Sequence, residues 1–339
     1  MQAIRLHPAP SGAISYSPSN PAPSSALRLD YDIPVPSLSA RGELLVCVKA
    51  STVIRDMLSW PEVYSHQYVI PGWDVAGIVT EVYSEESEFR PGDEVFGMAN
   101  TDRAATWAEY TIMKEDEVTR KPATLTFAQA AALPLSAQTA YEALFEHARI
   151  PIPNRKGLVA ESGVKVKEQR VLITGAAGAV GVYLVQLASA ANVHVVAASR
   201  SNVRNEEFLR GLGADEVVEY KMLDDYAGRF DVIIDVVGGE VLAKCWDYVA
   251  ETGRLITVDS ASFNFVKEHE KRGIRKMGVD ARFFIVKGSP KALRCIAEMV
   301  DARAVRSFVA EILPMARVRE AYDHANSRMS ARGKVILTF

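Results

Sequence analysis

The sequence has few of the features that mark secreted or membrane-spanning proteins. Its three cysteines, Cys47, Cys245 and Cys295, are odd in number and far apart. They do not form a disulfide framework, and they indicate a reducing compartment. No apolar run reaches the length that crosses a bilayer, and Met1–Pro10 lacks the apolar core of a signal peptide. We therefore expect a cytoplasmic protein with no membrane partner.

A strong excess of one charge is also missing. The formal net charge is −3 at pH 7, from 39 Lys and Arg against 42 Asp and Glu. This balance gives no reason to expect nucleic acid or an anionic membrane as a partner. Hydrophobic residues make up 48% of the 339 residues, which is ordinary for a globular protein of one or two domains.

The most informative stretch lies between positions 170 and 200. Val171–Thr174 is a β-branched run typical of a buried strand, and a small-residue turn follows it. Val180–Ala191 is then apolar at nearly every position, as a helix between two layers requires. Val193–Ala198 is a second buried strand, which completes a strand–helix–strand unit of about thirty residues.

The turn inside this unit has glycines at positions 175, 178 and 181, not the strict Gly-x-Gly-x-x-Gly spacing. Small side chains let the main chain approach a pyrophosphate, and the first amides of the helix point at its oxygens. Because strands precede and follow, we predict a dinucleotide site rather than a plain tight turn. The residues predicted to hold the pyrophosphate are Gly175, Ala176, Ala177, Gly178, Ala179 and Val180.

The end of the second strand predicts which dinucleotide binds. An NAD site usually has a carboxylate about twenty residues after the last glycine. Here that position falls on Ser199-Arg200-Ser201-Asn202, without a carboxylate. A hydroxyl and a guanidinium suit a 2′-phosphate instead. Arg204 either also reaches this phosphate or lies on a solvated helix face. We predict NADP(H) over NAD(H).

The strands before position 120 have a different character. Short alternating runs such as Glu43–Ala50 are separated by Pro-Gly turns, which favours a partly open β-barrel. Thr126 is predicted to cap a helix, with Gln129 three residues on. After residue 169, strands alternate with helices up to a sixth strand at Phe283–Val286, which implies a doubly wound parallel sheet. Gly333–Thr338 is expected to return to the first domain.

Seven motifs then occur in order along the chain. They are Pro71-Gly-Trp-Asp-Val-Ala-Gly77, Pro91-Gly-Asp-Glu-Val-Phe-Gly97, Leu133-Pro-x-x-Ala-x-Thr139-Ala140-Tyr141, Thr174-Gly-Ala-Ala-Gly-Ala-Val-Gly181, Leu212-Gly-Ala-Asp215, Asp231-x-x-x-Asp235-x-Val-Gly-Gly239 and Gly333-Lys-Val-Ile-Leu337. Together they resemble the medium-chain dehydrogenase/reductase superfamily, in its zinc-independent quinone oxidoreductase-like and enoyl reductase-like branch. The resemblance covers almost the whole chain.

This resemblance implies an α/β protein of two domains. Residues 1–120 and 302–339 would form a GroES-like, partly open β-barrel catalytic domain, and residues 121–301 a Rossmann NADP(H)-binding domain with a doubly wound parallel sheet. By position, Thr139 would approach the nicotinamide and Tyr220 the adenosine side, while Asp235–Gly238 would line the ribose region. The further residues that the resemblance implies for the cofactor are Val236, Val237, Phe283, Phe284 and Arg328.

Zinc ligands are missing where zinc-dependent relatives have them. A protein zinc site needs three or four His, Cys or acidic ligands. Such relatives carry a cysteine on the loop after the Glu43–Ala50 strand, and Gly-His-Glu where this chain has Gly72-Trp73-Asp74. Neither ligand is present here, so we predict no zinc.

Side chains are left to polarise a carbonyl and supply a proton, because the cofactor carries the hydride. Tyr64 lies where related reductases have a tyrosine, and it is either a proton donor or a packed aromatic. Arg55 either pairs with Asp56, which we favour, or binds a substrate carboxylate or phenolate. The candidate catalytic residues are therefore Tyr64, Arg55, Asp56 and Thr139. A quinone needs little acid catalysis, so an essential acid is not required.

The predicted function is NADPH-dependent hydride transfer to a quinone or to the C=C bond of an α,β-unsaturated carbonyl, in detoxification or in a biosynthetic pathway. Two alternatives stay open: a non-catalytic NADPH-binding structural or RNA-binding protein, and a carbonyl or alcohol oxidoreductase, which would lack a Lewis acid without zinc. The expected partners are a small quinone, enone or enoyl substrate and a second copy of the chain, paired through the edge strand near Phe283–Val286.

Overall fold

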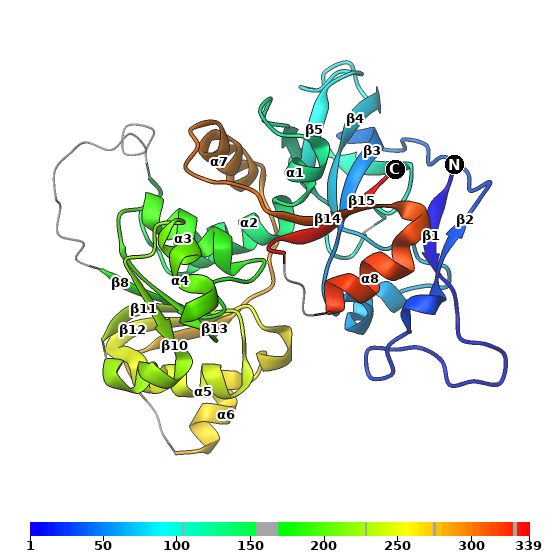
Figure 1. The fold of residues 1–339 in the computed structure, drawn as a ribbon. Helices are drawn as coiled ribbons and strands as arrows, with labels where there is room; N and C mark the ends of the chain where they lie inside the picture. The colour runs from blue at the N-terminus through cyan, green and yellow to red at the C-terminus, as the bar shows by residue number, and fades with distance from the viewer. Residues whose placement is uncertain (104, 154–168, 228, 274–275, 328–330) are drawn as a thin grey trace. The chain divides into compact units, whose positions relative to one another are not determined.

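A computed structural model describes residues 1–339 except 104, 154–168, 228, 274–275 and 328–330. The chain divides into two compact units. The first contains Met1–Leu135, Lys287–Asp301 and Arg306–Phe339, and the second contains Ser136–Val286 and Ala302–Val305. The middle of the chain therefore forms one unit and both ends build the other (Figure 1).

Three segments lie in a different unit from the one that the predicted domain boundaries give them. Residues 121–135 and 287–301 belong to the first unit, not to the domain predicted at 121–301, and Ala302–Val305 belongs to the second unit, not to the domain predicted at 302–339. The reason is packing: helix α1 (Phe127–Ala131) lies on strands β3 (Glu43–Val53) and β4 (Asp74–Val82) of the first unit. Helix α7 (Pro290–Asp301) likewise packs on strand β7 (Val118–Arg120).

The first unit is built on a seven-stranded sheet, in agreement with the expected GroES-like fold. Its order is β14-β15-β3-β4-β5-β7, with β6 also paired to β3, and a two-stranded sheet β1-β2 lies beside this path. The remaining elements of the unit are β1 (Ala3–Leu6), β2 (Leu27–Asp30), β5 (Glu94–Met98), β6 (Tyr110–Lys114), β14 (Val309–Pro314), α8 (Val318–Asn326) and β15 (Lys334–Thr338). A core of strand residues that includes Leu44, Val46 and Val79 is fully buried. As predicted, the carboxyl-terminal strand returns to this sheet, antiparallel to β3.

The second unit is a six-stranded parallel sheet with helices, as expected for a Rossmann-like domain. The strand order is β10-β9-β8-β11-β12-β13, and every pairing is parallel. The strands are β8 (Arg170–Ile173), β9 (His194–Ser199), β10 (Glu216–Glu219), β11 (Phe230–Asp235), β12 (Val249–Thr257) and β13 (Asp280–Phe283), and the helices are α2 (Pro134–Tyr141), the π-helix η5 (Glu142–His147), α3 (Gly181–Ala190), α4 (Asn202–Arg210), the 3₁₀ segment η6 (Tyr220–Tyr226), α5 (Gly239–Tyr248) and α6 (Phe265–Lys271). Helix α3 buries eight of its residues, which explains its nearly unbroken apolar sequence.

The predicted sixth strand at Phe283–Val286 is wrong in its position. Strand β13 spans Asp280–Phe283, and its register pairs Thr257 with Phe283. Because the neighbouring strand β12 ends at Thr257, residues beyond Phe284 have no partner strand to extend the ladder. The apolar run therefore continues past the strand into the segment that follows it.

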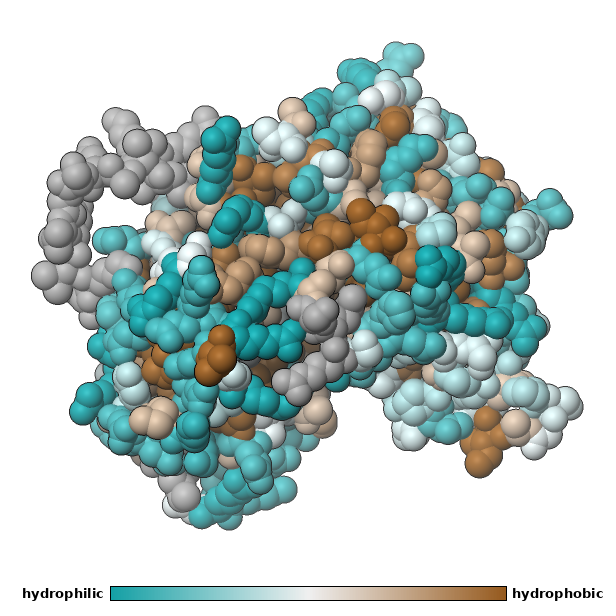
Figure 2. Space-filling model, in the orientation of Figure 1, coloured by the Kyte–Doolittle hydropathy of each residue, from teal (hydrophilic) through white to brown (hydrophobic). Residues whose placement is uncertain are grey.

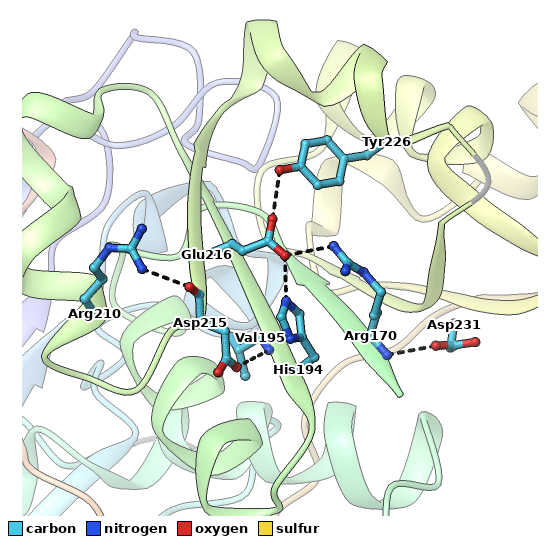
Figure 3. A network of polar contacts seen from close by, with 8 residues as sticks. All are labelled: Arg170, His194, Val195, Arg210, Asp215, Glu216, Tyr226 and Asp231. Atoms are coloured by element: carbon cyan, nitrogen blue, oxygen red, sulfur yellow. Dashed lines mark hydrogen bonds and ion pairs between the residues drawn. The ribbon is translucent and has the colours of Figure 1, made fainter. Parts of the chain in front are cut away.

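A polar network joins the amino ends of three strands of this sheet (Figure 3). Glu216, His194 and Arg170 are the first residues of β10, β9 and β8. Glu216 Oε1 lies 2.6 Å from His194 Nε2 and accepts a hydrogen bond from Arg170 at 3.0 Å, while Oε2 accepts one from the Tyr226 hydroxyl at 2.8 Å. Burial raises the pKa of Glu216, but these partners outweigh it and the net pKa lies below its ordinary value.

The surface over the helices of the second unit is mostly hydrophilic on the face that Figure 2 shows. Large apolar side chains are exposed in this unit only at intervals along the sequence, as at Val203 and Met222. Among the described residues, no helix combines the length and the apolar composition that a membrane span requires.

Candidate cofactor site

The first glycine of the turn is required by both its conformation and its neighbours. Gly175 has φ of 59°, in the left-handed region that favours glycine. A Cβ added there would lie 2.5 Å from Cγ2 of Val236 and 3.0 Å from Cγ2 of Val237. The turn after β8 is therefore packed directly against the turn after β11, which brings three of the predicted cofactor residues together.

The third glycine is required by close approach of the main chain. A Cβ added at Gly181 would lie 2.2 Å from the Gly175 carbonyl oxygen and 2.7 Å from the Ala176 backbone. The middle glycine, Gly178, is exposed, and only the Gly175 oxygen lies within 4 Å of its added Cβ, at 3.1 Å. The folded turn thus depends on positions 175 and 181, whereas position 178 faces open space in which a ligand can approach.

The start of helix α3 offers main-chain donors beside this open space. Ala179 is exposed, and Ala177 and Val180 are partly exposed. Their amides donate no hydrogen bond to any described residue, whereas the Gly178 amide donates to the Gly175 carbonyl at 2.8 Å. These amides lie at the positive end of a ten-residue helix, an arrangement that favours negative charge, and Gly178 leaves them accessible.

The end of strand β9 places a cation near this turn. Arg200 is exposed, and its charge acts on the phenol of Tyr220. The Ser199 hydroxyl is buried and already engaged. It donates a hydrogen bond to the Ser201 carbonyl at 3.3 Å and accepts one from the side-chain Nδ2 of Asn205 at 3.2 Å. Arg204 is exposed on helix α4. The guanidinium of Arg200 is therefore better placed than the Ser199 hydroxyl to meet a phosphate.

Tyr220 lies against the glycine turn itself. Its hydroxyl accepts a hydrogen bond from the Gly175 amide at 2.9 Å. Burial raises the pKa of this phenol, although the Gly175 amide and the Arg200 charge act in the opposite direction. The side chain predicted to contact the adenosine therefore also holds the first residue of the turn.

A buried carboxylate lies beneath these loops, and its structural role was not evident from the sequence. Asp235 ends strand β11 with none of its surface exposed. It accepts hydrogen bonds from the hydroxyls of Thr174 at 2.6 Å and Thr257 at 2.9 Å, and from the Gly238 amide at 2.9 Å. Burial raises its pKa, against these hydrogen bonds. Asp235 thus ties the carboxyl ends of β8, β11 and β12, where the predicted ribose contacts begin.

The remaining predicted cofactor residues lie near the sheet edge or outside the described residues. Phe283 ends β13, and Phe284, which is buried, follows it and packs against His147 of η5, with ring centroids 4.1 Å apart. Thr139 lies on helix α2 and is 5% exposed. Arg328 lies outside the described residues.

The other candidate catalytic residues belong to the first unit, and each is engaged there. The Tyr64 hydroxyl accepts a hydrogen bond from the Ala22 amide at 3.0 Å and donates one to the Leu58 carbonyl. Burial raises the pKa of this phenol. Arg55 Nε lies 3.4 Å from Asp56 Oδ2, and these side chains are 68% and 71% exposed. The described structure therefore places Tyr64 in a bracing contact and Arg55 in a surface ion pair.

A second buried carboxylate, in the first unit, lies where zinc-dependent relatives have a metal-ligand motif. Asp74 is fully buried, and its Oδ2 lies 2.8 Å from the Lys334 ammonium and accepts from the Thr52 hydroxyl at 2.5 Å. Its Oδ1 accepts from the Leu135 amide at 2.6 Å. The neighbouring Trp73 is buried, and its indole donates to the Thr101 carbonyl. Within the described residues, no group of three or more His, Cys, Asp or Glu could hold a metal ion.

Comparisons with known proteins agree with this architecture. A family profile described as "Alcohol dehydrogenase GroES-like domain" matches residues 40–123, and one described as "Zinc-binding dehydrogenase" matches residues 212–337. The chain is 31% identical over 306 residues to the "Probable zinc-binding oxidoreductase, mitochondrial" of Arthroderma benhamiae, across 87% of this chain and 88% of that protein. It is 30% identical over 289 residues to the human "NAD(P)H oxidoreductase RTN4IP1, mitochondrial", across 78% of this chain and 69% of the relative.

A third relative and a solved structure extend the comparison. The "2-methylene-furan-3-one reductase" of Solanum lycopersicum is 35% identical over 225 residues, which cover 61% of this chain and 52% of that protein. The solved quinone oxidoreductase from Coxiella burnetii matches with a TM-score of 0.81 and 24% sequence identity. The match covers 100% of this chain and 99% of that chain. At that identity the solved structure shows the shared fold, while the sequence relatives are all described as oxidoreductases or reductases.

Proposed function

Because the chain belongs to the medium-chain dehydrogenase/reductase superfamily, among its quinone oxidoreductase-like members, we propose that it is an NADPH-dependent, zinc-independent reductase. Its hydride acceptor would be a quinone or the C=C bond of an α,β-unsaturated carbonyl. One observation carries this proposal: unpaired amides at the start of α3 lie on the same edge of the sheet as the exposed Arg200, at the end of the adjacent strand. An oxidoreductase with a nicotinamide cofactor is the coarser statement that the relatives support.

The residues around the turn fit such a cofactor. When bound, the reduced nicotinamide would supply the hydride. The amides of Ala177, Ala179 and Val180 would bind the pyrophosphate, and Arg200 would pair with the 2′-phosphate of the adenosine ribose. Tyr220 would keep Gly175 in place while these contacts form.

The choice of acceptor rests on what the chain supplies for proton transfer. The one hydrogen of the Tyr64 hydroxyl is donated to Leu58, and its raised pKa makes the phenol a weaker acid. A quinone, which needs little acid catalysis, suits this arrangement. The tomato relative described as a furanone reductase supports the C=C acceptor as the second member of the proposal.

Zinc has no place in the proposed mechanism. One family profile and one relative are described as zinc-binding, but the motif that would supply ligands contains Trp73, an indole, and Asp74, whose charge is already neutralised by Lys334 at 2.8 Å. A cation added next to Asp74 would have to displace that ammonium. The proposed hydride transfer therefore relies on the cofactor and on neutral hydrogen-bond donors.

The test is oxidation of the reduced cofactor by the purified protein, followed by its absorbance. NADPH and NADH are each combined with a quinone and with a conjugated enone, and metal content is measured in the same sample. We expect turnover with NADPH at least about tenfold faster than with NADH, because a charge-assisted pair with the 2′-phosphate contributes only to NADPH. Equal rates, or stoichiometric zinc that is essential for turnover, would contradict the proposal.

Location and assembly remain proposals as well. We keep the cytoplasm as the proposed location, although two of the relatives above are described as mitochondrial. We also keep a homodimer through β13, which is the edge strand of its sheet. Sedimentation of the purified protein tests the dimer, and a monomer at micromolar concentration would contradict it.

A further inference from the structure

The Asp74–Lys334 ion pair lies at a junction that the proposed function does not use. Asp74 is on β4, and Lys334 begins β15, 260 residues later. Both side chains are nearly or fully buried, at 0% and 6% exposed. A buried pair is costly to desolvate and persists only where its geometry and its remaining hydrogen bonds are good. Here Thr52 and Leu135 complete the set of donors to the carboxylate.

The contact to Leu135 joins this pair to a helix. Leu135 is the second residue of α2, and its amide is one of the donors that a helix start leaves without an internal partner. The first residue, Pro134, has no amide hydrogen. The Asp74 carboxylate therefore caps the helix from a distant strand and places a negative charge at its positive end.

The capped helix leads directly into the cofactor-binding unit. Pro134 and Leu135 are the last residues of the first segment of unit one, and the helix continues from Ser136 in unit two. It passes without interruption into η5, which packs against α3, the helix that follows the glycine turn. At its end, His147 of η5 packs against Phe284. One continuous helical segment, 134–147, thus connects the ion pair with two parts of the candidate cofactor site.

We propose that the Asp74–Lys334 pair positions the cofactor site, by fixing the first turn of α2 and through it the contacts of η5 with α3 and Phe284. The proposal rests on the function proposed above, since it assigns the pair a role in that site. Asp74 is a positioning residue and not a catalytic one, because it acts through Leu135. Lys334 neutralises the carboxylate, which lets it remain buried as an acceptor.

Two matched double variants separate this role from simple stabilisation. Asp74→Asn/Lys334→Met removes both charges but keeps a side-chain oxygen for the Leu135 amide. Asp74→Ala/Lys334→Met also removes both charges and leaves that amide without an acceptor. For each folded variant, the dissociation constant of NADPH is measured by its fluorescence, well below the unfolding temperature. The isotope effect with deuterated NADPH is measured in the same samples.

We expect the Asn/Met variant to bind NADPH within about twofold of wild type, and the Ala/Met variant to bind about tenfold more weakly with slower hydride transfer, because small displacements of a site are costly. Equal NADPH affinities in the two folded variants would overturn the proposal and leave the pair a purely structural role. If the Ala/Met variant does not fold, Asp74→Glu serves instead. It keeps the charge but moves the carboxylate, and wild-type affinity in that variant would also overturn the proposal.

Amide hydrogen exchange distinguishes this failure from failure of the proposed function. Wild-type protein that binds neither NADPH nor NADH would contradict the proposed function alone. In that case the rate of amide hydrogen exchange in residues 142–147 and 175–190, measured without any cofactor, tests the positioning role. Faster exchange there in the Ala/Met variant than in the Asn/Met variant supports the positioning role, and equal exchange rates contradict it.

Discussion

The two ends of the parallel sheet in the second unit hold acidic networks of opposite character. At the carboxyl end, Asp235 is fully buried and is held only by hydroxyls and main-chain amides, and its pKa is raised. At the amino end, Glu216 is 31% exposed and is held by Arg170, His194 and Tyr226, and its pKa is lowered. The same chemical group is thus placed in a neutral setting at one end and in a charged setting at the other.

The difference follows from what each end of the sheet must accept. Unpaired amides and Arg200 lie at the carboxyl end, where the proposed cofactor would bring several negative charges. A network of neutral donors holds the loops there without adding another exposed ionic group. At the amino end, charged partners join three strands across their first residues. Four predictions test this difference between the two ends of the sheet.

The largest effect is expected from removal of the Asp235 acceptor. Asp235→Leu keeps the branched shape of the side chain but leaves Thr174, Thr257 and the Gly238 amide without their acceptor. We expect a loss of about 3 kcal/mol in the free energy of unfolding, measured by chemical denaturation. The control Asp235→Asn keeps one acceptor oxygen and should lose less than half as much. Equal losses in the two variants would show that the hydrogen bonds to Asp235 do not determine the loss of stability.

The next effect concerns the turn that Asp235 supports. Gly181→Ala places a Cβ 2.2 Å from the Gly175 oxygen, so the main chain must move, at a cost of about 2 kcal/mol and with loss of most NADPH affinity. The matched control is Gly178→Ala, whose Cβ has only one neighbour, at 3.1 Å. It should leave stability within about 0.5 kcal/mol of wild type. Calorimetry measures the thermal unfolding of both variants, with the NADPH affinity of Gly181→Ala in the same samples, and a similar loss of stability in the two variants would refute the packing argument.

A smaller change is expected from the cation at this end. Arg200→Gln keeps hydrogen-bonding capacity but removes the charge that would meet a 2′-phosphate. The preference for NADPH over NADH, as a ratio of kcat/KM values, should fall about tenfold, because a charge-assisted hydrogen bond is lost. Arg210→Gln is the control: Arg210 ends helix α4 and donates to the Asp215 carbonyl at the amino end of the sheet. An unchanged ratio in Arg200→Gln would remove Arg200 from cofactor selection.

The smallest effect is a difference in pH dependence, and its sign differs between the two ends. Because the pKa of Asp235 is raised by folding, its stabilising contribution is present below its unfolded pKa and is lost as pH rises through the folded pKa. Because the pKa of Glu216 is lowered, its contribution is present above its unfolded pKa and is lost as pH falls through the folded pKa.

The difference in unfolding free energy between wild type and Asp235→Asn should therefore fall with rising pH. The corresponding difference between wild type and Glu216→Gln should rise. Denaturation curves measured from acid to neutral pH test the sign of each change. Curves that move in the same direction would show that the two ends are not electrostatically opposed.

Much of the fold was predictable because local signals and packing agree. The strand–helix–strand unit around the glycine turn and the parallel sheet are confirmed. The predicted cap is confirmed too, since Thr126 and Gln129 exchange reciprocal hydrogen bonds at the start of α1. The two-domain architecture and the superfamily are confirmed by the fold and by the relatives. These features depend on neighbours within about thirty residues or on motifs that recur as a set.

The features that were missed depend on partners distant in the sequence. The edge strand β13 lies earlier than predicted because its end is determined by the end of β12, not by its own apolar run. The Asp74–Lys334 pair and the hydroxyl donors to Asp235 join residues 22 to 260 positions apart, and no local pattern indicates them. The roles of Tyr64, Arg55, Asp56 and Thr139 stay predictions, because a substrate contact is not determined by the fold of either unit alone.

The return of β15 into the first sheet has a consequence for how the protein is made. Strand β15 lies between β14 and β3, so the first sheet cannot close until the last segment of this chain has left the ribosome. The second unit consists almost entirely of a continuous middle segment and can form earlier. During synthesis Ala50–Val53 of β3 therefore lacks its partner strand, while the rest of β3 can already pair with β4 and β6. This interval is when the nascent chain is most exposed to aggregation and most dependent on chaperones.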